Sequence, residues 1–477
     1  MIISFLLGLL VMFITLVIAR TIMFKPEKNI EVSDEEISFD RSGAVENLQK
    51  LIRCRTISRY DHVGEDDAEF EKLISLLPQL YPWVYEKCTL QTFPDRGLLY
   101  KWEGKNHDAP TVFMAHYDVV PVNEEDWDCD PFEGFIKDGV LWGRGTLDTK
   151  ATFNGALFAA NHLIAEGFVP ENDIYLAFSG CEEVNGAGAL HIVNYFEEMG
   201  IIPAMVIDEG GAVVENAFPG LKSPCAVIGI AEKGMIDVEY RVKSNGGHAS
   251  APKPHTPVGV LSKACCNVEK KPFKFHLTPP AEQMFDTLGR HSTFLYRMIF
   301  ANMWCFGWVI DLLGKLQGGD INALTRTTVA FTQMSGSDAS NVIPPEATMV
   351  SNLRLNPADT MESALEYLKT TVDDEQVELK ILRGYNPSRI SRTDCEGYER
   401  VVKAVASTWR GCIPTPYLMM QCSDSRHWGK ISDRVYRFSA MDLTKEERGS
   451  IHGNNERIRT ECAERACEFF IRLMKLS

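Results

Sequence analysis

The sequence has 477 residues, of which 45% are hydrophobic and 24% are charged, and its formal net charge is -16. Such a composition is typical of globular proteins, and the length corresponds to two or three domains. Because nucleic-acid binding requires basic patches, the acidic balance argues against a nucleic-acid partner.

The first residues form one long apolar run. Residues 1–19 carry no charged side chain, and a helix of that length, at about 1.5 Å per residue, approaches the ~30 Å hydrocarbon thickness of a bilayer. We therefore expect a transmembrane helix over residues 1–22, which would make this a single-pass membrane protein. A cleaved signal peptide is the alternative, but no basic segment precedes the run and no A-x-A pattern follows it.

Basic residues after this run bear on its orientation. Arg20, Lys25 and Lys28 follow it, and the positive-inside rule then places the remaining chain on the cytoplasmic side. Glu27 and Glu31 are interleaved with them, so the side of the membrane stays open.

The next segments indicate a linker and then an α/β domain. Residues 23–42 are polar and acidic and are expected to form the linker. Helices are predicted over residues 43–53 and 69–80, and strand-like and helix-like segments then alternate up to residue 231. Such alternation is typical of a sheet with largely parallel core strands.

The pattern changes at Glu232. Over residues 232–385, period-two strands such as "MIDVEYRVKS" combine with helical stretches such as "TMESALEYLKTTV". Segments of the first kind return over residues 386–477. We therefore predict one catalytic domain in two parts, 43–231 and 386–477, with an α+β domain inserted between them.

One stretch of the predicted insertion, residues 293–313, is strongly apolar. A second membrane span is one interpretation. Arg297 and Asp311 interrupt the run, however, and Asn302 lies in its middle, and such groups are costly inside a bilayer. A buried or interfacial helix is therefore favoured.

Two polar residues stand in the apolar segment "MAHYDVVPV", residues 114–122. Side chains two positions apart on a strand project to the same face, so His116 and Asp118 should point the same way. A metal-bound imidazole commonly donates its second N–H to a carboxylate that fixes its orientation. We interpret His116 as a metal ligand and Asp118 as its orienting partner, and a purely structural buried histidine is the alternative.

Further acids stand where predicted elements meet. Asp148 follows a glycine-rich turn, just before a helix expected to begin near Thr149, where it could face a site or simply cap the helix. Glu182 and Glu183 end a strand, and adjacent residues of an extended chain face opposite sides. This predicts different roles for the two, metal binding and proton transfer, and a solvated acidic loop is the alternative.

The remaining candidates are Asp208 and Glu209, at the end of "MVIDEGG", and His452 in "SIHGNNERI". Two histidines with several carboxylates and no thiolate suit a pair of divalent cations such as zinc. A pair of metal ions can activate water and clamp the oxygens of a reacting group, which is hydrolase chemistry.

These motifs resemble those of the dizinc aminoacylase and carboxypeptidase family of metallohydrolases. The resemblance covers about residues 45–470 and rests on "AHYDVVPV", "WDCDPFEGFIKDGVLWGRGTLDTK", "GCEEVNGAGA", "DEGG", "GGHASAP", "SNVIPPEA", "NLRLNP", "CSDSRHW" and "HGNNERI". The stretch "MIFANMWCFGWVIDLL" is most similar to the branch with carboxypeptidase S and the N-fatty-acyl-amino-acid synthase/hydrolase. The resemblance implies a dizinc-exopeptidase-like α/β catalytic domain, a lid and dimerisation domain over residues 232–385, and two bound Zn²⁺.

The resemblance also implies a metal-binding role for most of the candidates. His116 and one acid of the Asp208–Glu209 pair would bind one zinc, and either acid of that pair could be the ligand. Glu183 and His452 would bind the other zinc.

The other roles concern catalysis and substrate binding. By resemblance, Asp148 would bridge both ions and Glu182 would be the general base. His248 would reach the active site of a partner subunit in a homodimer and stabilise the oxyanion. Asn341 and Arg354 would hold the substrate, and a guanidinium suits the carboxylate of an amino acid.

The implied activity is hydrolysis of an amide, in a peptide or an N-acyl amino acid, next to a free carboxylate. An N-fatty-acyl-amino-acid hydrolase/synthase is the alternative within the branch, and a non-catalytic binding protein on the same fold is the alternative of another class. The complete ligand set and Glu182 argue against the latter. Resemblance to carboxypeptidase S would place the catalytic domain on the non-cytoplasmic side, opposite to the positive-inside rule.

Overall fold

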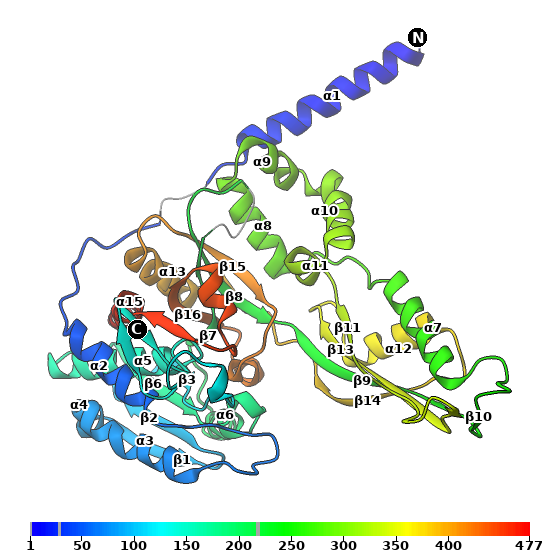
Figure 1. The fold of residues 1–477 in the computed structure, drawn as a ribbon. Coiled ribbons are helices and arrows are strands. Elements are labelled where there is room, and N and C mark those ends of the chain that lie inside the picture. Colours follow the sequence, from blue (N-terminus) through cyan, green and yellow to red (C-terminus); the bar gives the residue numbers. More distant parts are fainter. Residues whose placement is uncertain (1, 27–29, 216–219) are drawn as a thin grey trace.

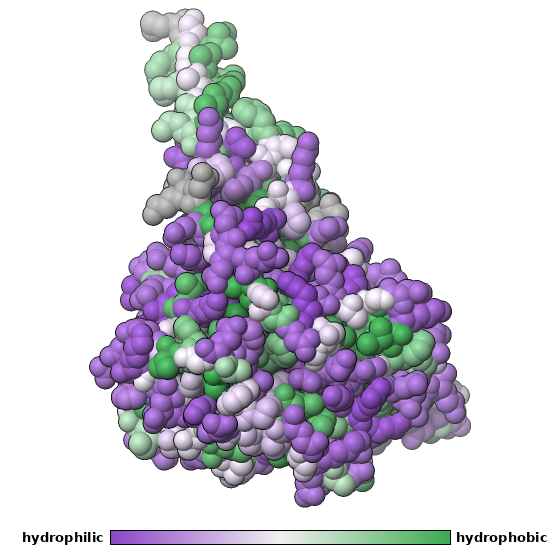
Figure 2. All heavy atoms as spheres, turned by 90° about the vertical axis from the view of Figure 1, so that its left-hand side faces the viewer, coloured by the Kyte–Doolittle hydropathy of each residue, from purple (hydrophilic) through white to green (hydrophobic). Residues whose placement is uncertain are grey.

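A helix that stands apart from the body of the molecule marks the N-terminus. The computed structural model describes residues 2–26, 30–215 and 220–477, and α1 (Ile2–Met23) projects away from the rest (Figure 1). This helix is long and apolar enough to cross a membrane, a property that a signal sequence shares. Its surface is largely hydrophobic, whereas the body is mostly hydrophilic (Figure 2). Glu27 and Lys28, considered above for orientation, lie outside the described residues.

An eight-stranded sheet forms the centre of the body. Its core pairings β6–β3, β3–β7, β7–β16 and β8–β15 are parallel, which confirms the prediction of a largely parallel sheet, and β1 and β2 add an antiparallel edge. In spatial order the strands are β1 (Thr89–Phe93), β2 (Gly97–Trp102), β6 (Asn172–Ser179), β3 (Asn106–His116), β7 (Met205–Val214), β16 (Val435–Leu443), β8 (Cys225–Glu232) and β15 (Ile413–Met419).

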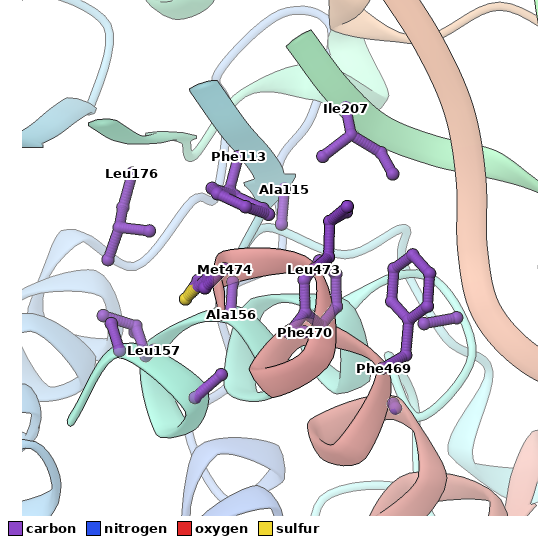
Figure 3. Packing of buried hydrophobic residues seen from close by; sticks show 14 of the residues in the cluster. Phe113, Ala115, Ala156, Leu157, Leu176, Ile207, Phe469, Phe470, Leu473 and Met474 are labelled. Atoms are coloured by element: carbon purple, nitrogen blue, oxygen red, sulfur yellow. The ribbon is translucent and has the colours of Figure 1, made fainter. Parts of the chain in front are cut away.

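Helices cover both faces of this sheet because its central strands are apolar on both sides. On β3, Phe113 and Ala115 belong to one buried cluster, which also contains residues of α5 and α15 (Figure 3). Val112 and Met114 alternate with them and belong to a second cluster on the side of α6. The helices of this domain are α2 (Arg41–Ile52), α3 (Asp67–Leu80), α4 (Pro82–Lys87), α5 (Lys150–Ala165), α6 (Gly188–Glu198), α13 (Glu396–Thr408), α14 (Lys445–Gly449) and α15 (Thr460–Lys475).

A small sheet lies beside the main one and carries no predicted site residue. It pairs β17 (Arg457–Arg459), β5 (Val140–Trp142) and β4 (Phe135–Lys137) in antiparallel fashion. Because β17 follows His452 and β5 precedes Asp148 in the chain, this pairing draws the two segments together.

Residues 30–40 of the segment predicted to be a linker have no regular structure but are attached to the body. Ile37 is buried, and the guanidinium of Arg472 donates to the backbone oxygen of Glu35 at 2.9 Å. The Glu35 carboxylate also pairs with Lys475 at 2.8 Å. The Glu35 region is therefore held on the last helix, whereas Ser33 and Glu31 contact α13, through Ser407 at 3.0 Å and Lys403 at 3.0 Å.

A second antiparallel sheet, which we call the lid sheet, lies beside the catalytic part (Figure 1). Helices α7 (Pro257–Lys270) and α12 (Met361–Val372) pack on it and share its buried core. A two-residue pairing of β10 (Gly247–His248) with β12 (Val342–Ile343) lies beyond it. The strands of the lid sheet are, in spatial order, β11 (Thr328–Ser335), β13 (Glu346–Leu355), β9 (Gly234–Lys243) and β14 (Glu378–Tyr385).

Four of the five helices between β10 and β11 share a buried core with β8 and β15 of the catalytic sheet, although they lie in the segment predicted to form the insertion. Met284 and Phe285 of α8 (Pro279–His291) share a core with Ile413 and Leu418 of β15. The stretch 293–313, predicted as one helix, is two: α9 (Phe294–Ala301) and α10 (Met303–Gln317) are bent by 109° at Asn302. The fourth helix is α11 (Gly319–Thr325).

Candidate metal centre

His116 occupies the carboxyl end of β3 and is 2% exposed. Its Nδ1 lies 3.0 Å from the backbone oxygen of Asp118, which can only accept, so Nδ1 carries the proton. The Nε2 atom is then left to face two acids, Asp148 Oδ1 at 3.0 Å and Glu209 Oε1 at 3.2 Å. Burial opposes a second proton on this imidazole, but the charge of Glu209 raises the pKa of His116 well above its ordinary value. A cation between Nε2 and the carboxylates would take the place of that proton.

Asp148 lies between the two histidines. Its Oδ1 faces His116 Nε2 and its Oδ2 faces His452 Nε2 at 3.1 Å. Burial opposes ionisation of this carboxyl, but the hydrogen bonds with both imidazoles hold the pKa of Asp148 well below its ordinary value. The carboxylate is therefore charged and central. Asp148 precedes α5, whose N-cap position belongs to Thr149, so Asp148 is free to face the site.

The sequence predicted that Glu182 and Glu183 end a strand, but in the structure they lie outside it. They begin a short 3-10 turn, Glu182–Val184, after β6. The backbone N–H groups of both donate to the carboxylate of Asp118, at 3.1 and 3.2 Å, and Ser58 Oγ donates to the same carboxylate at 2.6 Å. Asp118 therefore positions the two glutamates as well as His116, whose Nδ1 lies 3.3 Å from Asp118 Oδ1.

The two glutamates take part in two overlapping groups of potential ligands. Ligand atoms of His116, Glu182 and Glu209 lie within 4.8 Å of one another, and so do those of His116, Asp148 and Glu183. Glu183 Oε2 is also 3.1 Å from His452 Nε2. Five predicted ligands and the predicted base thus meet in one place.

The adjacent acids Asp208 and Glu209 point to opposite sides of β7, as strand geometry requires. Glu209 faces His116, whereas the Asp208 carboxylate accepts a hydrogen bond from the backbone N–H of Ser425 at 3.0 Å. Among the described residues, Glu209 contacts one of the two site histidines, whereas Asp208 contacts neither. The geometry therefore favours Glu209 as the ligand.

The cluster concentrates negative charge in a buried place. Burial and the charge of Asp148 raise the pKa of Glu183 and of Glu209 to about 7. Burial also raises the pKa of Glu182 well above its ordinary value. Hydrogen bonds with Asp148 and Glu183 raise the pKa of His452 to about 10. The shifts of the three glutamates show carboxyls that lack a compensating positive charge, and the shift of His452 shows the excess of negative charge around it. Divalent cations would supply the missing positive charge.

The residues present fit a pair of divalent cations. The donors are imidazole nitrogens and carboxylate oxygens without a thiolate, a set that suits zinc. Glu183 Oε1 is buried without a hydrogen-bond partner among the described residues. A metal ligand needs such a free oxygen, so the orphaned atom agrees with the donor set.

Glu456, which was not among the candidates, supports the loop that carries Asp148. Its carboxylate accepts from the backbone N–H groups of Gly145, Leu147 and Asp148 at 3.0, 2.7 and 3.2 Å, and it pairs with Arg144 at 2.7 Å. Both partners of that ion pair are almost fully buried. Glu456 and Arg144 stand in motifs quoted above, but their contact joins residues far apart in the sequence, which no local pattern reveals.

The segment "CSDSRHW" supplies a second supporting group. Asp424 is buried, and Ser179 Oγ donates to its carboxylate at 2.5 Å. Arg426 Nη1 donates to the Ser423 backbone oxygen at 2.8 Å. Burial opposes the charge on Arg426, but the nearby carboxylates of Asp424 and Glu182 raise its pKa. The guanidinium therefore offsets part of the negative charge of the site.

The predicted substrate-binding residues lie on the lid. His248 is exposed on β10, where its Nδ1 contacts Ser250 Oγ at 2.7 Å. Asn341 is exposed, and its backbone oxygen accepts from Ala249 N–H at 2.9 Å. Arg354 is half-buried on β13. Within the described ranges, no hydrogen bond or ion pair joins these three to the cluster described above.

Comparison with known proteins identifies the family. Residues 112–476 match the model of peptidase family M20/M25/M40. The chain belongs to this family. The match contains every residue of the cluster, so the carboxylates and imidazoles that meet at the sheet edge are the candidate metal site of a protein from a metallohydrolase family.

Similar proteins cover almost the whole chain. The N-fatty-acyl-amino acid synthase/hydrolase of Xenopus tropicalis is 33% identical over 99% of this chain and 94% of its own length. Probable carboxypeptidase S-like 2 of Dictyostelium discoideum is 30% identical over 98% and 92%. An M20 family metallo-carboxypeptidase from Sulfolobus solfataricus shares the fold, with a TM-score of 0.66 over 91% of this chain and 98% of its own, at 18% identity.

Proposed function

We propose that the protein is a membrane-anchored, two-zinc amidohydrolase that cleaves N-acyl amino acids or peptides next to a free carboxylate. The observation that carries this proposal is the position of Asp148 between His116 and His452, with Glu182 beside them. This cluster does not stabilise the fold, because it leaves several buried carboxyls without compensating charge. Buried groups with shifted pKa values are typical of functional sites.

Two zinc ions would be held by His116 and Glu209 on one side, by Glu183 and His452 on the other, and by Asp148 between them. When bound, they would polarise the scissile carbonyl and make a water molecule acidic enough to react at neutral pH. Binding of the ions would displace the second proton from each imidazole, so that Nε2 of His116 and of His452 could serve as ligands.

Glu182 would move the proton. Its carboxylate takes a proton from the attacking water as the new C–O bond forms, and it delivers that proton to the amide nitrogen as the C–N bond breaks. Asp118 holds the backbone of Glu182 at 3.1 Å and thereby fixes its distance from the ligands. The products are a carboxylic acid and the free amine of an amino acid.

Substrate binding would involve the lid and a second subunit. Arg354 can bind the free carboxylate of the substrate through paired N–H donors. His248 is exposed on β10, and Asn341 is exposed in the turn just before the paired strand β12, as is required of residues that reach into another subunit's site. We expect a homodimer in which His248 stabilises the oxyanion of the partner's reaction.

A long-chain acyl group is the substrate class that we favour. The similar relative from Xenopus tropicalis is named for N-fatty-acyl amino acids, and it covers nearly the whole chain. The apolar helix α1 would keep the enzyme at the membrane, where such amphiphiles concentrate. The same site can also form the amide from fatty acid and amino acid, because each step is reversible.

A matched substrate panel tests this proposal. Dipeptides, N-acetyl amino acids and N-long-chain-acyl amino acids that share one amino acid should be hydrolysed to different extents, with the long-chain members turned over most efficiently. A preference for dipeptides would redirect the proposal to a carboxypeptidase. Protease protection in intact membranes, with and without detergent, would show on which side the body lies.

A further inference from the structure

The helix α1 is fixed to the body along one side. Asn302, at the bend between α9 and α10, donates from Nδ2 to the backbone oxygen of Val17 at 3.2 Å and to Thr21 Oγ1 at 3.3 Å. The guanidinium of Arg20 donates twice to the backbone oxygen of Ala301, at 3.2 Å. We call residues 294–317, which form α9, the bend and α10, the elbow. In Figure 1 it lies beside the inner end of α1.

The elbow meets α1 well before the helix ends. The ring of Trp304 packs edge-on against Phe13 at 5.9 Å between centroids. Phe13 lies ten residues before Met23, which corresponds to about 15 Å along a helix. If α1 spans a hydrocarbon core of about 30 Å, this contact lies far inside the leaflet next to the body. Part of the elbow then shares that leaflet with α1.

The exposed side chains of the elbow match such surroundings. On α10, Trp304, Trp308, Leu312 and Leu316 recur every four residues and form one exposed stripe, 46–74% exposed, while Ile310 on the other side is buried. The only charged residues of α10, Asp311 and Lys315, pair with each other at 2.8 Å. Phe294 and Leu295 add apolar surface at the start of α9.

The backbone carbonyl groups at the bend have hydrogen-bond partners within the protein, as a position inside a bilayer requires. A break in a helix frees carbonyl oxygens, and lipid offers them no donor. Here Met298 O accepts from the Asn302 side chain at 2.9 Å, and Ile299 O accepts from its backbone N–H at 3.2 Å. Ala301 O accepts from Arg20, and Asn302 O accepts from the N–H of Cys305 at 3.0 Å. Four carbonyls of the bend are thus satisfied within the protein.

We propose that the elbow inserts into the membrane leaflet that adjoins the body, with Trp304 and Trp308 in contact with lipid. This inference rests on the proposed anchoring by α1, whose apolar surface continues through the Phe13–Trp304 contact onto α10. Two separate membrane contacts hold the catalytic sheet at a fixed angle to the bilayer, because α8, which precedes the elbow, packs on β15. A single flexible tether would leave that angle free.

Tryptophan fluorescence provides the test, because α1 contains no tryptophan. The full chain is reconstituted into phosphatidylcholine vesicles with plain or brominated acyl chains, since bromine quenches only tryptophans that contact lipid. Brominated lipid should quench the wild type, and the Trp304→Phe/Trp308→Phe variant should lose most of that quenching. Trp83→Phe is the matched control, because Trp83 is 40% exposed on the catalytic body, and it should leave the quenching unchanged.

A Leu10→Trp substitution in the double variant separates this inference from the anchor on which it rests. Leu10 is exposed on α1, so quenching of this tryptophan reports on α1 alone. Quenching of Leu10→Trp without quenching of the native tryptophans would overturn the elbow proposal and leave the anchor intact. No quenching in either protein would overturn both. Protection of Trp304 and Trp308 from bromine and from aqueous iodide, in a chain that is dimeric, would assign the stripe to a second copy and overturn the proposal.

Discussion

The edge of the catalytic sheet that carries the candidate metal site and the lid differ in whether one chain brings the predicted site residues together. At the sheet edge, side chains from distant segments converge, and His116 alone contacts three carboxylates. On the lid, His248 and Asn341 are exposed, with local contacts to Ser250 and Ala249. A parallel sheet gathers its strand ends at one edge, so it can build a metal centre without help. Groups that must close over a substrate need a movable element or another subunit.

The largest expected effect concerns proton transfer at the sheet edge. Glu182→Gln keeps the size of the side chain but removes the base, so turnover should fall about 10²- to 10⁴-fold. Bound metal and the free energy of unfolding should stay close to wild type. Glu198→Gln, an exposed glutamate on α6, is the control and should change neither. Near-normal turnover by Glu182→Gln would remove the base assignment.

A second prediction asks whether the lid completes the site of another subunit. His248→Ala should lower turnover by about 10²-fold or more without loss of metal, because an oxyanion donor is removed. When His248→Ala chains are mixed and re-dimerised with Glu182→Gln chains, each mixed dimer should contain one complete site and activity should reappear. Activity that stays at the level of the separate variants would contradict a role in the partner's site.

A third prediction compares neighbours on β7. Glu209→Gln should weaken binding of one of the two metal ions, since Glu209 faces His116. Asp208→Asn should have a smaller effect, about 10-fold in metal affinity, because the amide oxygen can still accept from Ser425 N–H. Metal content after dialysis against graded zinc buffers measures both. The opposite ranking would make Asp208 the ligand.

The smallest effect is expected on the lid sheet. Arg354→Lys keeps the charge but loses the paired donors, so KM should rise about 10-fold while kcat changes little. Arg241→Lys on the adjacent strand β9, where Arg241 pairs with Glu239 at 2.9 Å, is the matched control and should leave KM unchanged. An unchanged KM in Arg354→Lys would place the substrate carboxylate elsewhere.

Many of the residues at the sheet edge could be predicted because short sequence patterns mark the strands and turns that carry them. Two of the candidate ligands lie on recognisable strands, His116 at the end of β3 and Glu209 on β7. Strand alternation separates Asp208 from Glu209, but it does not say which side faces the site. The turn at Glu182 and Glu183 escaped prediction because it depends on the Asp118 carboxylate, more than sixty positions away.

Other features depend on packing between distant segments. The apolar stretch 293–313 breaks into two helices because Asn302 binds α1, a contact across 285 residues. Glu456 supports the Asp148 loop across 308 residues. A single sequence does not show which distant residues contact each other, so these pairs could be identified only from the structure.

The most direct test of the central claim is a metal titration of turnover. Protein stripped with a chelator should be inactive toward an N-long-chain-acyl amino acid, and zinc should restore activity as binding approaches two ions per chain. Glu182→Gln should bind the same two ions and stay inactive. Full turnover by the stripped protein, or binding of two zinc ions without any turnover by the wild type, would contradict the account.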